Sequence, residues 1–510
     1  MQDGQNGMPD FAENPQSVSE AVPPVEKIRC HPVMVVEFAL QGLIFGIIVA
    51  YVAGAFLADY PEIPGIYVSD ALLVLFLASF IWIGYWRWKK TTVTFTENEM
   101  TVVRDTVFKL NKRIPYSKIA SVNANRGILN RITGTTKLLF NVNSAVNAAL
   151  PEVSLIFGKE TADRIRSDLS GKMYDNNMVP ENEKSIPSIV DVTAKDIVFH
   201  SFLSQPTAVS IYGLIFFVIG LLQIIFQGAT AGFTATVMLF VPGYVFPVIT
   251  TIFYYYGYKI YRIGDTIYIS HGLIREYKTS FKINKINAVV VFSPLFPRMI
   301  KMKMIRAEVL GLGSSEEKGQ TPLLCPLKDS LTVEKILNAL VPELNEKFET
   351  DLQPPEAAKP ILTNALLWSI VTAAVIFIVF AAVSRSYDVG VYGILFPIAA
   401  ALAVIAYFAY GIRSTKVLKY GLGTDVFTMV TGVIDRAEMT MYYDKVQIAS
   451  VKNGPVSRIW NVSRCEVSLL SASGEKKTKS GYFRTEDLEK IPDIVVDRIV
   501  EGRYDYRKYL

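Results

Sequence analysis

The sequence has few of the residues on which most metal and catalytic sites depend. Its 510 residues include three cysteines and three histidines. Cys30, Cys325 and Cys465 lie far apart and form no CxxC pair, which argues against a disulfide framework and against a structural zinc site. The histidines are equally scattered, so acid–base chemistry has no evident centre. We therefore expect no enzyme, no metal and no cofactor.

Charge is also scarce, and hydrophobic residues take its place. Charged residues make up 19% of the chain and hydrophobic residues 51%, whereas a soluble domain carries about a quarter charged residues. This balance favours a membrane protein with polar domains between apolar spans. A net charge of +5 is small for this length and gives no indication of nucleic-acid binding. Residues 1–32 are polar, which predicts a disordered tail.

Six apolar runs follow the tail, and each is long enough to cross a bilayer, which takes about 20 residues. They occur in pairs separated by short loops, so we expect three transmembrane hairpins. These hairpins cover residues 33–86, 207–256 and 361–410.

The flanks of the hairpins predict their orientation. The loops 58–69 and 227–235 contain no Lys or Arg, and the loop 384–390 contains only Arg385. Each second span instead exits into several basic residues. Because Lys and Arg are retained on the cytoplasmic side, we expect both termini and all long polar segments to be cytoplasmic, at the plasma membrane.

The polar segments after the hairpins repeat one another. A Lys/Gln-Ile-x-Ser/Ala-Val motif occupies residues 118–122, 285–289 and 447–451. Arg131 and Arg298 lie nine residues after the motif's last Val, and Arg458 lies seven after it, so we expect a two-residue deletion and a Lys-to-Gln change in the third copy.

Each polar segment also shows the same order of elements. Turn-like clusters separate alternating strand patterns, and a helical pattern ends each segment at about residues 160–169, 332–341 and 485–496. We expect six or seven strands and one helix per copy. The predicted domains are residues 87–172, 257–350 and 411–510, with linkers at residues 173–206 and 351–360.

This triplicate organisation resembles the bacterial pleckstrin-homology-like (PH-like) membrane proteins of the YdbT type. The resemblance rests on the repeated motif above and on a Gly-Leu/Val-Ile turn at Gly272 and Gly432. It implies a membrane α-helical part with six helices, and three cytoplasmic PH-like domains, each a bent β-barrel capped by a C-terminal helix. It also implies a smaller PH-like membrane protein as partner, and a role in envelope homeostasis or stress resistance.

Basic residues in the first two copies are the candidate binding site. A cationic surface beside the cytoplasmic leaflet attracts anionic lipid headgroups, by about 1 kcal/mol per residue. Solubility and the positive-inside bias explain the same residues without any ligand, so both readings stay open. The candidates for lipid or partner binding are Lys109, Lys112, Arg113, Arg275, Lys278, Lys282, Arg298, Lys301, Lys303 and Arg306.

Two features inside the spans suggest an alternative function. Glu37 is a carboxylate within the first span, and Pro242, Gly243 and Pro247 could break the fourth. Intramembrane carboxylates and broken helices both mark transport sites. The sequence therefore predicts a membrane scaffold that presents three PH-like domains to proteins or anionic lipids, with a small-solute transporter or channel as the alternative.

Overall fold

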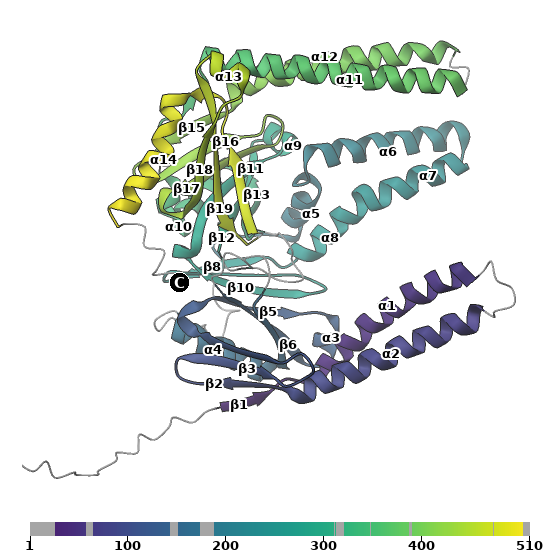
Figure 1. Cartoon of the computed structure of the whole chain (residues 1–510), viewed down its shortest axis with the longest axis vertical. Coiled ribbons are helices and arrows are strands. Elements are labelled where there is room, and N and C mark those ends of the chain that lie inside the picture. The colour runs from purple at the N-terminus through teal and green to yellow at the C-terminus, as the bar shows by residue number, and fades with distance from the viewer. Residues whose placement is uncertain are drawn as a thin grey trace, which may run out of the picture. The chain divides into compact units, whose positions relative to one another are not determined.

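The computed structural model describes residues 26–57, 65–142, 151–173, 188–310, 312, 321–346, 348–386, 390–472 and 474–502. The chain divides into two compact units, Met1–Pro115 and Tyr116–Leu510. Figure 1 shows their helices and strands, and each unit is described here by itself.

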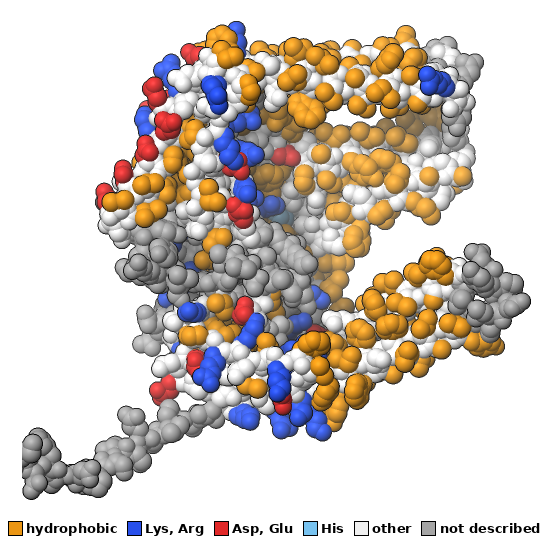
Figure 2. All heavy atoms as spheres, in the orientation of Figure 1, with side chains coloured by type: hydrophobic (Ala, Val, Ile, Leu, Met, Phe, Trp, Pro, Cys, Tyr) orange, Lys and Arg blue, Asp and Glu red, His pale blue; other side chains and the backbone are white. Residues whose placement is uncertain are grey.

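Six helical segments are long and apolar enough to cross a membrane, as the sequence predicts, and they make this a multi-pass membrane protein. They form three antiparallel hairpins, and Figure 2 shows hydrophobic side chains covering the hairpins over most of their length. The spans are α1 (Val33–Leu57), α2 (Gly65–Lys90), α6 (Thr207–Gln227), the single span formed by α7 (Ala231–Phe240) and α8 (Phe246–Tyr255), α11 (Ala358–Ser386) and α12 (Leu395–Val417).

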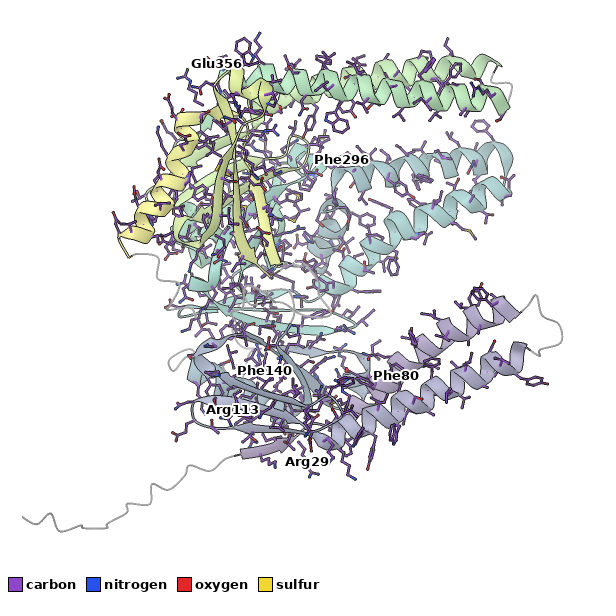
Figure 3. All side chains as sticks on the ribbon, in the orientation of Figure 1. Arg29, Phe80, Arg113, Phe140, Phe296 and Glu356 are labelled. Atoms are coloured by element: carbon purple, nitrogen blue, oxygen red, sulfur yellow. The ribbon has the colours of Figure 1, made fainter. Side chains whose placement is uncertain are left out.

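Small residues let the paired helices approach closely. A Cβ atom at Gly42 of α1 would collide with the ring of Phe80 on α2, and Figure 3 labels Phe80 there. Gly213 of α6 meets the ring of Tyr244 in the same way. Between α7 and α8 the backbone forms a π-helix, η2 (Val241–Val245), which contains Pro242 and Gly243. The predicted break in the fourth span is therefore a single π turn.

The first unit contains one antiparallel four-stranded sheet, in the order β1-β2-β3-β4. Its strands are β1 (Glu26–Arg29), β2 (Thr91–Phe95), β3 (Glu99–Arg104) and β4 (Leu110–Pro115).

The second unit contains a six-stranded sheet that joins copy one to copy two. Its order is β7-β6-β5-β10-β9-β8, and β5 pairs with β10 antiparallel. Its strands are β5 (Ile119–Arg126), β6 (Thr135–Val142), β7 (Val153–Gly158), β8 (Lys259–Ile263), β9 (Thr266–His271) and β10 (Glu276–Lys282).

A seven-stranded sheet joins copy two to copy three by the same arrangement. Its order is β13-β12-β11-β17-β16-β15-β14, and β11 pairs with β17. Its strands are β11 (Ile286–Ser293), β12 (Met302–Val309), β13 (Leu323–Asp329), β14 (Asp351–Leu352), β15 (Lys419–Leu422), β16 (Val426–Thr431) and β17 (Arg436–Tyr442).

The last sheet belongs to copy three alone. It consists of β18 (Val446–Lys452), β19 (Val462–Ser471), β20 (Gly474–Lys479) and the short β21 (Phe483–Arg484), with β18 at one edge. The expected β-rich domains are therefore present, but the closed barrel is wrong for copies two and three. In copy two, β10 and β11 pair with β5 and β17 of the neighbouring copies and not with each other. In copy three, β17 pairs with β11 of copy two, so the two sheets of these copies do not join.

A helix follows the strands of each copy, as the sequence predicts. These helices are α4 (Lys159–Met173), α10 (Ser330–Leu340) and α14 (Thr485–Val500). The apolar face predicted for α10 is buried, with Val333, Ile336, Leu337 and Leu340 at most 7% exposed. Asp329 caps α10 by accepting a hydrogen bond from the Thr332 amide.

The structure corrects the alignment of the third copy. A short 3-10 turn ends at Lys118, Lys285 and Lys445 directly before β5, β11 and β18. A bulge follows the first residue of each of these strands. Lys445, and not Gln447, is therefore the counterpart of the two lysines. Each copy then places its Arg thirteen residues after that Lys, and the predicted deletion and Lys-to-Gln change do not exist.

The polar tail and the linkers are more structured than predicted. Residues 1–25 lie outside the described residues, but β1 pairs with β2, so the tail expected at residues 1–32 is too long. The linker expected at residues 173–206 contains α5 (Ala194–Leu203), which a Thr193–Asp196 capping box begins and whose Ile197 is buried. The linker expected at residues 351–360 contains β14 and the start of α11.

Candidate functional site at the membrane boundary

The basic candidates of copy one lie on and beside strand β4. Lys109 precedes the strand and is 3.9 Å from the carboxylate of Asp105, but both side chains are largely exposed, so this ion pair contributes little. Lys112 is half-buried and Arg113 is exposed. Figure 3 labels Arg113 on its strand.

The candidates around β10 lie at the joint between copies one and two. A Cβ atom at Gly127 would be 3.6 Å from Nε of Arg275, so this guanidinium lies against copy one. Lys278 is opposite Ala124 in the β5–β10 ladder. Burial, then Lys445 and then Lys282, lower the pKa of Lys285 to about 8. These residues connect two copies and do not surround one pocket.

The remaining candidates of copy two separate into different environments. Lys301 lies in a left-handed turn with φ 59°, and β12 begins only at Met302. Lys301 and Lys303 therefore do not share one face of a strand, although their spacing would allow it, because the turn breaks the alternation. Arg306 has its guanidinium carbon 5.4 Å from the ring centre of Phe292.

Arg298 belongs to a cluster that the tertiary structure assembles at the membrane boundary. It lies on α9 (Leu295–Met299), and Leu295 donates its amide to the hydroxyl of Thr207, the first residue of α6. The Thr207 amide donates to the Asp435 carboxylate at 2.9 Å, and its hydroxyl also contacts that carboxylate. Asp435 comes from the turn between β16 and β17, so one contact network joins copies two and three to the second hairpin.

This boundary cluster, defined as Arg298, Arg413, Asp435 and Arg436, carries more positive than negative charge. Burial, then Arg436 and Arg413, lower the pKa of Arg298, and Asp435 opposes them. The buried Nε of Arg436 has no hydrogen-bond partner within the described part of the chain. Three guanidiniums beside one carboxylate at the end of a span can accept a phosphate or another anion.

An apolar groove runs along the third hairpin, beside copy three. It has a volume of about 680 Å³ and is lined by both α11 and α12. Its walls include Trp368, Ala403 and Ala406 within the spans. Ile434 and Arg464 of β19 lie at the end of the groove that meets copy three. Ile434 is next in sequence to Asp435 of the boundary cluster. The volume is within the roughly 300–1,000 Å³ of small-molecule sites.

Arg464 is held in place at the polar end of this groove. Its guanidinium carbon lies 4.0 Å from the ring centre of Tyr482, a cation–π contact that fixes the plane of the side chain. Its buried Nε makes no hydrogen bond to any described residue. An apolar channel inside the membrane that ends at an oriented guanidinium has the chemistry of an acyl chain joined to an anionic headgroup.

A second, more polar pocket of about 350 Å³ lies at the boundary end of the second hairpin. His200 and Arg306 line it together with Tyr254 and Tyr255. The Leu327 amide donates to Nδ1 of His200, so the imidazole carries its proton on Nε2. Burial, and then Arg306, lower the pKa of His200 to about 3. This histidine is therefore neutral at pH 7.

The break in the fourth span that suggested transport is packed within its hairpin. The carbonyl of Leu239, just before the π turn, accepts a hydrogen bond from the Tyr212 hydroxyl at 2.8 Å. Tyr244 of the π turn also packs on Gly213 of α6, so the turn lies against the first helix of its hairpin. Among the described residues, no three His, Cys, Asp or Glu side chains come together as a metal site.

Sequence reasoning identified Arg298 but missed its neighbours. Arg413 belongs to the basic flank of the third hairpin, whereas Arg436 was not among the candidates and Arg464 gave no signal. The repeat could have pointed to Arg436, because it lies directly after the turn that begins at Gly432. A Cβ atom at position 432 would collide with the Asp435 carbonyl, so this tight turn requires glycine.

Comparison with known proteins agrees with this architecture. The chain belongs to the bacterial PH domain family, which matches it three times, over residues 44–173, 213–341 and 366–499. Each match begins inside the first helix of a hairpin and ends at the helix that closes the copy, so the repeated unit includes the hairpin. No curated protein and no solved structure matches the chain. It is a membrane-associated protein with three PH-like copies, and the narrower YdbT type stays a prediction.

Proposed function

We propose that this protein is a non-catalytic membrane scaffold that binds acidic phospholipid at the cytoplasmic boundary of its third hairpin. The observation that carries the proposal is the apolar groove along α11 and α12, which ends at the oriented guanidinium of Arg464. The acyl chain lies in the groove, and the phosphate binds Arg464.

The physical case depends on where the groove lies. An acyl chain gains little by moving from the bilayer to an apolar groove, because both are hydrocarbon-like. Selectivity must therefore come from the headgroup. A hydrogen bond to a charged group contributes about 1.5–3 kcal/mol, which corresponds to roughly a tenfold or larger difference in affinity. Zwitterionic lipids carry the same phosphate but add a cationic amine, which the nearby guanidiniums repel. Acidic lipids should thus be preferred over zwitterionic ones.

The boundary cluster supports the same conclusion. Arg298, Arg413 and Arg436 lie beside the turn that carries Ile434 into the groove. Their excess positive charge attracts the negative inner leaflet and raises the local concentration of acidic lipid. The scaffold role follows from the sheets that copies share, since these hold the domains of the second unit together next to the membrane.

The test measures lipid bound to the full-length chain purified in mild detergent. We expect native mass spectrometry to show phosphatidylglycerol bound in preference to phosphatidylethanolamine. Arg464→Gln should reduce phosphatidylglycerol binding roughly tenfold, and Arg464→Lys should retain part of it because the charge is kept. Ala406→Phe, which fills the groove, should reduce binding without any change in charge.

Arg385→Gln is the matched control. Arg385 lies in the last turn of α11, at the opposite end of the same hairpin from Arg464. Equal loss of lipid in Arg385→Gln and Arg464→Gln would point to general charge attraction and contradict the site. A wild-type chain that retains no acidic lipid would contradict it as well.

The remaining expectations stay predictions. A smaller PH-like membrane protein as partner and a role in envelope homeostasis are implied only by family resemblance. Crosslinking in native membranes followed by identification of the captured protein tests the partner.

A further inference from the structure

Successive copies of this protein are joined by one repeated device, an antiparallel strand pair. Residues 124–126 of β5 pair with residues 276–278 of β10 between copies one and two. Residues 288–293 of β11 pair with residues 436–441 of β17 between copies two and three. In both joints the first strand of one copy's second sheet meets the last strand of the next copy's first sheet.

The two ends of the repeat carry the same edges without a described neighbour. β18 is the counterpart of β5 and β11, and it is the terminal strand of its sheet. β4 is the counterpart of β10 and β17, and it also ends its sheet. An exposed edge strand presents a row of backbone donors and acceptors that can pair with another chain. One chain thus carries both halves of a joint.

The exposure of equivalent side chains supports this view. Ala288 in β11, which pairs with Met441 of copy three, is fully buried, whereas its counterpart Ile448 in β18 is 58% exposed. A large apolar side chain on a strand edge, at a position that is otherwise buried, is what an uncovered interface would present.

The arginine of a second contact in the joint recurs at the free end of copy three. The Arg131 guanidinium of copy one donates to the Leu273 carbonyl in the β9–β10 turn of copy two. Arg458 is the counterpart of Arg131 and is exposed at the end of copy three.

We propose that the β18 edge of one chain pairs with the β4 edge of a second copy of this chain, so that the protein assembles head to tail in the membrane. Aligning β18 with β11, and β4 with β17, places residues 448–452 antiparallel to residues 110–114. In this register Val451 lies opposite Asn111, as Val291 lies opposite Glu438 within the chain. Such a contact is heterologous, so it forms rings if the rotation closes and open rows if it does not.

The membrane favours this contact. Both internal joints link copies whose hairpins enter the same bilayer, so one further step of the same kind keeps the next chain in that bilayer. Confinement to two dimensions also raises the effective concentration of the two edges.

The experiment uses two differently tagged full-length chains, one with Val451→Cys and the other with Asn111→Cys, expressed together. Directly opposite residues in antiparallel strands have Cα atoms about 4.5–5.5 Å apart, which suits a disulfide. We expect mild oxidation of membranes to give a mixed-tag dimer, and either variant expressed alone to give none. The three native cysteines are buried.

The chain itself offers the positive control. Val291→Cys with Glu438→Cys tests the equivalent intrachain pair under the same conditions. If that pair crosslinks and the Val451–Asn111 pair does not, the proposal is overturned. Crosslinking of Val451→Cys to a different protein overturns it too, since the edge then has another occupant.

A second variant tests the interface without cysteine chemistry. Ile448→Asp should abolish the head-to-tail dimer detected by co-purification of the two tags. Val496→Asp is the control, because Val496 is 55% exposed on α14 and takes no part in the strand pairing. Equal amounts of dimer in Ile448→Asp and wild type would contradict the proposed register.

Discussion

At the scale of single residues, the buried polar groups decide how the second copy responds to pH. His200 is 1% exposed and neutral, and the amide of Leu327 needs its unprotonated Nδ1. Protonation would remove this acceptor and place a charge near Arg306. The protein therefore favours the neutral imidazole in the folded state.

This preference predicts a loss of stability in mild acid. The folded pKa of His200 is about 3, below the ordinary 6.5, so the unfolded state binds the proton first. Its contribution is present above pH 6.5 and is lost as the pH falls. We expect the free energy of unfolding to drop by about 2 kcal/mol more between pH 7 and pH 5 in wild type than in His200→Gln.

Thermal unfolding of the purified chain, followed by intrinsic fluorescence at both pH values, checks this prediction. His31→Gln serves as the control, because His31 is only half-buried. The same pH dependence in wild type and His200→Gln would show that other groups determine the acid response.

At the scale of elements, close contacts between the helices of a hairpin determine which glycines can be replaced. Gly213 of α6 faces the ring of Tyr244 in the π turn, and an added Cβ atom would collide with that ring. Gly220 of the same helix has Thr236 Cγ2 at 3.6 Å as its nearest neighbour, which is ordinary van der Waals contact.

These contacts predict opposite outcomes for two similar substitutions. Gly213→Ala should destabilise the second hairpin by about 1–3 kcal/mol, as overpacking usually does. Gly220→Ala should leave stability unchanged or slightly improved. Thermal unfolding in detergent distinguishes the two, and equal melting temperatures would show that the π turn adapts to the added methyl group.

The strands show where local sequence stops being informative. The turn at Gly272 could be recognised from sequence because its requirement is local: a Cβ atom there would collide with the Arg275 carbonyl. The pairing of β11 with β17 could not be recognised from sequence, because the paired residues are about 150 positions apart. Each of these edges could equally have closed a barrel within its own copy.

At the scale of the whole molecule, the repeated hairpin predicts one orientation for all six spans. Each hairpin loop is poor in Lys and Arg and each exit is rich in them. We expect Ala229→Cys, in the loop of the second hairpin, to react with a membrane-impermeant thiol reagent in intact cells. Lys490→Cys, on α14, should react only after the cells are opened.

The native cysteines provide little background in this assay, because all three are buried. Labelling of Lys490→Cys in intact cells would place the PH-like copies outside. That result would also remove the inner-leaflet lipids from the proposed function.

The candidate site shows the same division between local and long-range information. Arg298 was predictable, since it recurs at a fixed distance from a motif. Arg464 was not, because only the packing of copy three against α11 and α12 brings it to the end of the groove.

The sequence by itself determined the six spans, the three copies and the helix that ends each copy. These depend on the length of apolar runs and on short-range periodicity, which neighbouring residues fully specify. Only the tertiary structure decided which strand edges pair, where the arginines gather and where the groove lies. Those outcomes depend on contacts between residues that are distant in the chain, and backbone hydrogen bonding alone allows more than one solution.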